Sequence, residues 1–171
     1  MSEEINLNQQ NFQEVVSIKL KSAKDSSLPA KEMLMMHDDM TQLGRLYYRG
    51  GIKKDEYINL SQKITWAYEP GLARFATLPE FIEALKQLRV EKNEAEGILD
   101  HENDHALVAI KHGKKIAYCL HFGRNPNGTL MYLPFLEMSG KVDDFETYKE
   151  IQLATGDPSD LDIDAVDLTK I

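Results

Sequence analysis

The chain has a single cysteine, Cys119, among its 171 residues, so it cannot form an internal disulfide. Long apolar runs are also missing, because stretches such as MLMM at residues 33–36 are far shorter than the ~20 residues needed to cross a bilayer. The first residues, MSEEINLNQQ, have neither the basic nor the apolar part of a secretion signal. We therefore expect a cytoplasmic protein outside the membrane, in which Cys119 is a buried and inert thiol.

Positive charge is scarce, since 20 Lys and Arg stand against 28 Asp and Glu and the net charge is -8. This balance disfavours binding to the backbone of a nucleic acid. The hydrophobic fraction of 42% is ordinary for a globular protein, and a chain of this length suits one compact domain. We expect a single domain over residues 1–171, with residues 1–10 as a disordered N-terminal tail because they are polar and rich in Asn and Gln.

Most of the remaining chain has apolar residues at helical spacing, interrupted by Pro and Gly. Residues 12–20 predict a short helix, with a strand as the alternative. Further helices are predicted over about residues 29–48, 54–68, 77–88 and 93–111. The 77–88 helix opens at a capping box, because Glu80 follows Thr77 by three positions.

The pattern changes after Gly113. KIAYCLHFG and TLMYLPFLE are β-prone runs joined by RNPNG, and Asn127-Gly128 is a strong turn signal. They predict a small antiparallel β-hairpin over about residues 115–137, followed by a helix near residues 143–151 and a short C-terminal helix that begins at Ser159. The expected fold class is α+β, mostly helical with one hairpin.

The segment His101-Glu102-Asn-Asp-His105 lies within the predicted helix 93–111. Positions i and i+4 project from the same face of a helix, so His101 and His105 can place two imidazoles on one metal ion. In zinc hydrolases with this pattern, a third protein ligand leaves one position for water, whose proton the glutamate accepts. The segment predicts a zinc-dependent hydrolase of an amide or similar carbonyl, with Glu102 as general base.

HENDHALVA, followed by KIAYCLHFGRNPNGTLMYLP, resembles the peptidase domain of the FtsH family of ATP-dependent zinc proteases. In that family a His-Glu-x-Gly-His-Ala helix precedes a hairpin with a similar Gly-x-x-Met-x-x-Pro run, although Asp104 stands here in place of the glycine. TGDPSDLDIDA is similar to the family's Thr-Gly-x-x-x-Asp-Leu segment, whose Asp is the third zinc ligand. The resemblance covers about residues 98–165 and implies Asp160 as that ligand, with a peptide or protein as substrate.

The residues themselves leave the third ligand open. His112 shares the face of His101 and His105 but lies ~10 Å along the helix from His105, too far for the same ion. Glu137, Glu146 and Glu150 are the other candidates downstream.

Two other functions also remain open. Glu102-x-x-His105 is the Glu-x-x-His unit of di-iron helical bundles, but the chain has no second such unit, and the lone His37 beside Asp38 and Asp39 is expected on the surface. The other alternative is a non-enzymatic acidic module that binds a protein partner. Its apolar surface would be the Met-rich helix, unless its methionines, Met33, Met35, Met36 and Met40, simply pack in the core.

Overall fold

The fold is described from a computed structural model, which describes residues 2–138 and 145–154. The helices in these ranges are α1 (Ser2–Asp25), α2 (Ala30–Tyr48), α3 (Lys54–Tyr68), α4 (Leu78–Gln87), α5 (Lys92–Lys111) and α6 (Phe145–Gln152). The strands are β1 (Leu28–Pro29), β2 (Leu72–Phe75), β3 (Ile116–Arg124) and β4 (Leu130–Met138). The expected α+β, mostly helical fold is therefore confirmed. The C-terminal helix predicted from Ser159 lies outside the described residues.

The predicted helix ends follow from local chemistry. Thr77 caps α4, because its hydroxyl accepts a long hydrogen bond of 3.4 Å from the backbone N–H of Glu80. The Glu80 carboxylate accepts from the N–H of Ala76, 3.2 Å away, which is one residue before the donor expected of a capping box. Shortly after the C-terminal end of α2, Gly50 adopts a φ of +81°, a conformation that glycine takes without strain.

The β3–β4 hairpin is antiparallel along its whole length, with Ile116 opposite Met138 and Arg124 opposite Leu130. Its turn has Gly128 at a φ of +88°, and the Gly128 N–H donates to the carbonyl of Asn125 across 2.9 Å. The hairpin predicted from Asn127-Gly128 is therefore confirmed.

The hairpin belongs to a larger mixed sheet that the sequence analysis did not predict. Antiparallel β2 and the two-residue parallel β1 both pair with β3, on the edge opposite β4. Both strands are too short for a recognisable alternation of apolar and polar residues.

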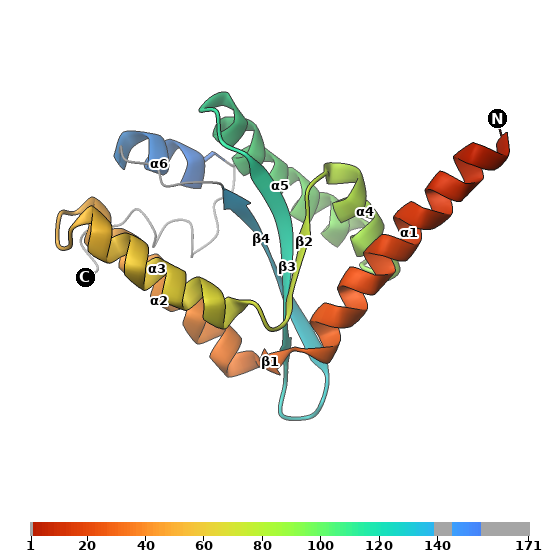
Figure 1. Ribbon diagram of the computed structural model, residues 1–171, viewed down its shortest axis with the longest axis horizontal. Coiled ribbons are helices and arrows are strands. Elements are labelled where there is room, and N and C mark those ends of the chain that lie inside the picture. The colour runs from red at the N-terminus through yellow and green to blue at the C-terminus, as the bar shows by residue number, and fades with distance from the viewer. Residues whose placement is uncertain (1, 139–144, 155–171) are drawn as a thin grey trace.

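The side chains of β3 alternate between two faces of the sheet. Tyr118, Leu120 and Phe122 belong to the main core, which also contains buried residues of α1, α4 and α5: Val16, Leu20, Phe81, Leu85 and Ala106. Figure 1 shows α1, α4 and α5 on one side of the sheet, and α2 with α3 on the other. The alternate residues, Cys119 and His121, therefore face α2.

Helix α1 begins at Ser2, whereas a disordered tail over residues 1–10 and a helix over 12–20 were expected. The first ten residues contain neither Pro nor Gly, so the sequence has no signal that would end the helix before Ser2. In Figure 1 the N-terminal part of α1 extends away from the sheet. None of the helices in the described ranges has the length and apolarity needed to span a bilayer.

Candidate metal centre

His101 and His105 lie together on α5, as their spacing predicted. Their Nε2 atoms are 3.2 Å apart, and the two rings meet edge to face with centroids 4.8 Å apart. Two nitrogens bound at ~2.0 to 2.1 Å to one tetrahedral zinc are separated by about the same distance. The imidazole pair therefore fits two positions of a zinc site.

A backbone carbonyl orients the ring of His105. Its Nδ1 lies 2.6 Å from the carbonyl oxygen of Ile151, in the last turn of α6. Because a carbonyl only accepts hydrogen bonds, Nδ1 carries the proton, and in the neutral ring Nε2 presents its lone pair towards His101. A carbonyl bonded to the far nitrogen is the usual arrangement around a metal-ligating histidine. His105 is only 6% exposed, which restricts the ring further.

Packing and charge hold α6 beside this pair. Ile151 and Ala109 form a small buried cluster between α6 and α5. Glu150 accepts from His112 across 3.0 Å and from Lys111 across 3.4 Å, and the hydrogen bond from His112 is the main reason why its pKa is lowered. His112 is the C-cap residue of α5, so Glu150 contacts the end of that helix.

Glu102 is buried between α5 and the sheet, with an exposed fraction of 5%. Burial raises the pKa of Tyr118, and the nearby Glu102 carboxylate raises it further. The Tyr118 hydroxyl donates to Oδ1 of Asn103 across 3.3 Å. The candidate base is thus in a low-dielectric environment next to β3.

The described residues do not supply a third ligand, since no group of three or more His, Cys, Asp or Glu side chains able to hold a metal occurs among them. Glu150 pairs with His112 and Lys111, while Glu146 is exposed on α6. Asp160, the ligand implied by the family resemblance, lies outside the described residues.

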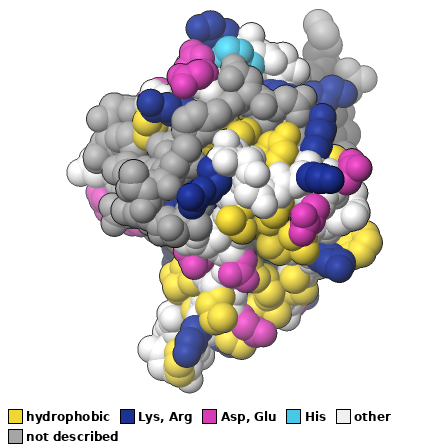
Figure 2. Space-filling model, turned by 90° about the vertical axis from the view of Figure 1, so that its left-hand side faces the viewer, with side chains coloured by type: hydrophobic (Ala, Val, Ile, Leu, Met, Phe, Trp, Pro, Cys, Tyr) yellow, Lys and Arg dark blue, Asp and Glu magenta, His cyan; other side chains and the backbone are white. Residues whose placement is uncertain are grey.

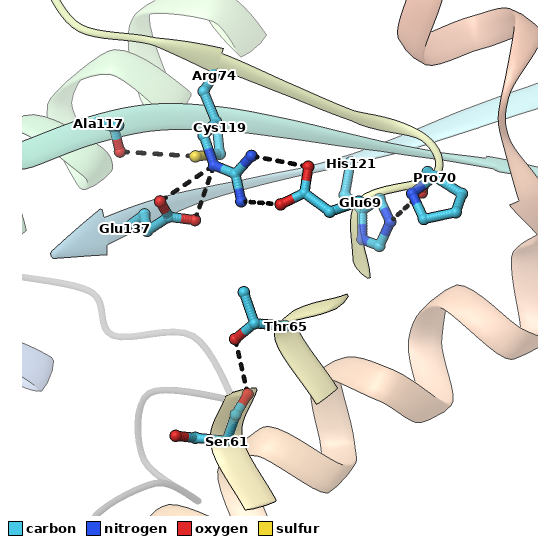
Figure 3. Close-up of polar contacts among 9 residues, drawn as sticks. All are labelled: Ser61, Thr65, Glu69, Pro70, Arg74, Ala117, Cys119, His121 and Glu137. Carbon is cyan, nitrogen blue, oxygen red and sulfur yellow. Dashed lines mark hydrogen bonds and ion pairs between the residues drawn. The ribbon is translucent and has the colours of Figure 1, made fainter. Parts of the chain in front are cut away.

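The remaining carboxylate candidate, Glu137, lies on the other face of the sheet (Figure 3). It accepts two hydrogen bonds from Nε of Arg74, at 3.0 and 3.1 Å, while Glu69 accepts from the other guanidinium nitrogens at 2.8 and 3.1 Å. Cys119 is fully buried in this region and forms no disulfide. Burial raises the pKa of its thiol, and the negative charge of Glu137 raises it further. The expected buried thiol is confirmed, and Glu137 is a structural carboxylate.

His37, expected on the surface, is only partly exposed and contacts a buried histidine. Its Nε2 lies 2.9 Å from Nδ1 of the fully buried His121, whose Nε2 lies 3.1 Å from the carbonyl oxygen of Pro70. His121 therefore donates to Pro70 and accepts from His37. Burial, and secondly the proximity of His121, lower the pKa of His37 to about 3; burial also lowers that of His121. No sequence pattern predicts this second pair, because His37 and His121 are 84 positions apart.

The Met-rich segment of α2 divides between core and surface. Met33 is fully buried, whereas Leu34 and Met35 are 44% and 56% exposed. They line an open groove of about 470 Å³ that Pro126 and Met131 of the hairpin complete. Figure 2 shows the side of the molecule where α2 and α3 lie, and hydrophobic side chains gather in its lower half with acidic ones among them.

Comparisons with known proteins add no relative. A scan with models of protein families finds no match, and searches of curated proteins and of solved structures find none either.

Proposed function

We propose that this protein is a zinc-dependent hydrolase that acts on a peptide or protein. The observation that supports this best is the arrangement of His101 and His105, whose Nε2 atoms are 3.2 Å apart while the Ile151 carbonyl holds Nδ1 of His105. A buried imidazole whose tautomer is set in this way is prepared to bind a cation through its other nitrogen.

The third ligand in this proposal is Asp160. Ile151, whose carbonyl contacts His105, comes shortly before Asp160 in the chain. An extended residue spans ~3.3 to 3.6 Å, so the intervening chain is long enough to bring the Asp160 carboxylate back to the histidines. Two imidazoles and one carboxylate make up a common ligand set of catalytic zinc.

The chain then has side chains both to hold the metal and to accept a proton. Zinc held by these residues would act as a Lewis acid, which lowers the pKa of water and polarises a carbonyl. Glu102, which is buried next to the sheet, would accept the proton of that water as general base. We also propose a cytoplasmic location, in keeping with the free thiol of Cys119, and no nucleic-acid partner, in keeping with the charge of -8.

Hydrolysis of a peptide library by zinc-loaded protein tests this proposal. Glu102→Gln should retain zinc, but its rate of hydrolysis should fall by about 10²-fold to 10⁴-fold, because the amide cannot accept the proton. Asp100→Asn, which neutralises an exposed carboxylate of the same helix, is the matched control and should stay active. Equal activity of Glu102→Gln and wild type would refute the assignment of Glu102.

A second candidate function is the non-enzymatic interaction module, favoured by the exposure of Leu34 and Met35 along the groove. Met and Leu side chains on a surface adapt readily to the apolar residues of a partner. A wild-type protein that neither binds zinc nor hydrolyses any peptide would favour this function. The di-iron alternative has no second set of ligands in the described part of the chain.

A further inference from the structure

Helix α6 contacts α5 at two points with different chemistry. Near the middle of α5, the Ile151 carbonyl accepts from Nδ1 of His105. At the end of α5, the Glu150 carboxylate lies 3.0 Å from Nε2 of His112 and 3.4 Å from Nζ of Lys111. Glu150 and Ile151 are adjacent in sequence. The position of the Glu150 carboxylate therefore depends on the position of the Ile151 carbonyl, and the reverse also holds.

The same part of α6 is also fixed from its other side. Tyr148 stacks on Tyr48 of α2 with ring centroids 4.2 Å apart, and its hydroxyl lies close to the backbone of Gly44. Ile151 is buried against Ala109. The aromatic and apolar contacts hold α6 between α2 and α5, and the Glu150 pairs add polar contacts at the end of α5.

From these contacts we propose that Glu150 is a positioning residue for the metal centre. By binding His112 and Lys111, Glu150 keeps the Ile151 carbonyl against His105, and the carbonyl keeps the His105 proton on Nδ1 and its lone pair on Nε2. The inference rests on the proposed zinc site. It adds a coupling: zinc binding through His105 and docking of α6 on α5 stabilise each other.

The coupling follows from linkage. If the docked α6 presents His105 in the tautomer that binds zinc, docking raises the affinity for zinc, and zinc must then favour docking by the same factor. Amide hydrogen exchange in α6 should therefore slow when zinc is added to the wild type. In His105→Ala, which has lost the ring, zinc should leave this exchange unchanged.

Reversal of the charge of Glu150 provides the main test. In Glu150→Lys the new ammonium group faces Lys111 and His112, so attraction is replaced by repulsion. The control is Glu96→Lys, which makes the same charge change at an exposed carboxylate of α5 that pairs only loosely with Lys92, at 4.0 Å. We expect the dissociation constant for zinc to rise about threefold to tenfold in Glu150→Lys and less than about twofold in Glu96→Lys.

Imidazole ¹⁵N spectra of the zinc-free protein give a second readout. The wild type should show distinct protonated and unprotonated nitrogens for His105, and Glu150→Lys should move the two signals towards each other as the tautomers mix. Normal zinc binding by the wild type, with unchanged affinity and unchanged His105 signals in Glu150→Lys, would overturn this inference and leave the hydrolase proposal standing. A wild type that binds no zinc would instead refute the proposed function and the coupling, while the His105 signals would still decide whether Glu150 positions the ring.

Discussion

Nδ1 of His105 donates to the carbonyl oxygen of Ile151 across 2.6 Å, and this bond joins the His-Glu-x-x-His helix to a segment 46 positions further along the chain. It gives one imidazole both a structural and a chemical role. The structural role keeps the Ile151 carbonyl paired inside the protein. The chemical role leaves Nε2 ready to bind a cation.

The two histidines should therefore differ in their effect on stability. In His105→Ala the Ile151 carbonyl loses its 2.6 Å hydrogen bond and keeps only the 3.4 Å one from the N–H of Ala154. The free energy of unfolding should therefore fall by about 1 to 2 kcal/mol. His101→Ala keeps the hydrogen bond between His105 and Ile151, so its free energy of unfolding should fall by less. Both variants should lose zinc. Urea unfolding of the zinc-free proteins measures this difference, and equal losses in the two variants would contradict the role given to the carbonyl.

The His37–His121 pair predicts acid sensitivity. The folded state lowers the pKa of both rings, that of His37 to about 3, so below the unfolded value of about 6.5 the unfolded chain binds more protons than the folded one. Stability should be fully present above pH 6.5 and fall as the pH decreases towards 3, by at most ~1.4 kcal/mol per pH unit for each histidine.

Urea unfolding between pH 7.5 and 4.5 measures this slope. His37→Leu removes one of the two titrating rings, so its stability should depend less on pH, even if it is lower at neutral pH because His121 has lost a partner. A wild-type slope equal to that of His37→Leu would show that His37 does not titrate as its burial requires.

Alanine substitutions at two glycines can distinguish the cost of backbone strain from the cost of steric overlap. Gly128 and Gly71 both have positive φ values, +88° and +83°. A Cβ on Gly128 meets nothing within 4 Å, whereas one on Gly71 would lie 2.6 Å from the carbonyl oxygen of Phe122. Gly128→Ala should cost about 1 kcal/mol from strain alone. Gly71→Ala should cost clearly more because the sheet must also move, and similar melting temperatures for the two variants would contradict this.

The thiol of Cys119 should resist reagents in the native protein. Its side chain is fully buried, and burial together with the Glu137 charge raises its pKa, so the reactive thiolate is rare at neutral pH. A disulfide reagent should modify one thiol per chain quickly in denaturant and only slowly without it. Equally fast reaction in both conditions would place Cys119 at the surface.

Sequence patterns were sufficient where the governing interactions are local. Asn127-Gly128 predicted the hairpin, and Thr77 with Glu80 predicted the start of α4, because turns and caps depend on neighbouring residues. The i, i+4 spacing likewise predicted that His101 and His105 meet.

Contacts between residues far apart in the chain could not be predicted from sequence patterns. A backbone carbonyl such as that of Ile151 has no signature in the sequence, and the partnership of His37 with His121 depends on how α2 packs on the sheet. Glu137 was a plausible metal ligand by its residue type, and only the fold places it beside Arg74 on the opposite face. The four-residue β2 was missed because so short a strand is defined by its pairing with β3.

The zinc content of the purified protein tests the central claim most directly. Wild-type protein prepared without chelators should contain about one zinc per chain by elemental analysis, and His105→Ala should contain almost none, because the loss of one of three protein ligands removes most of the affinity. A folded wild type that is free of metal and takes up no added zinc would contradict the proposal that His101 and His105 form a metal centre.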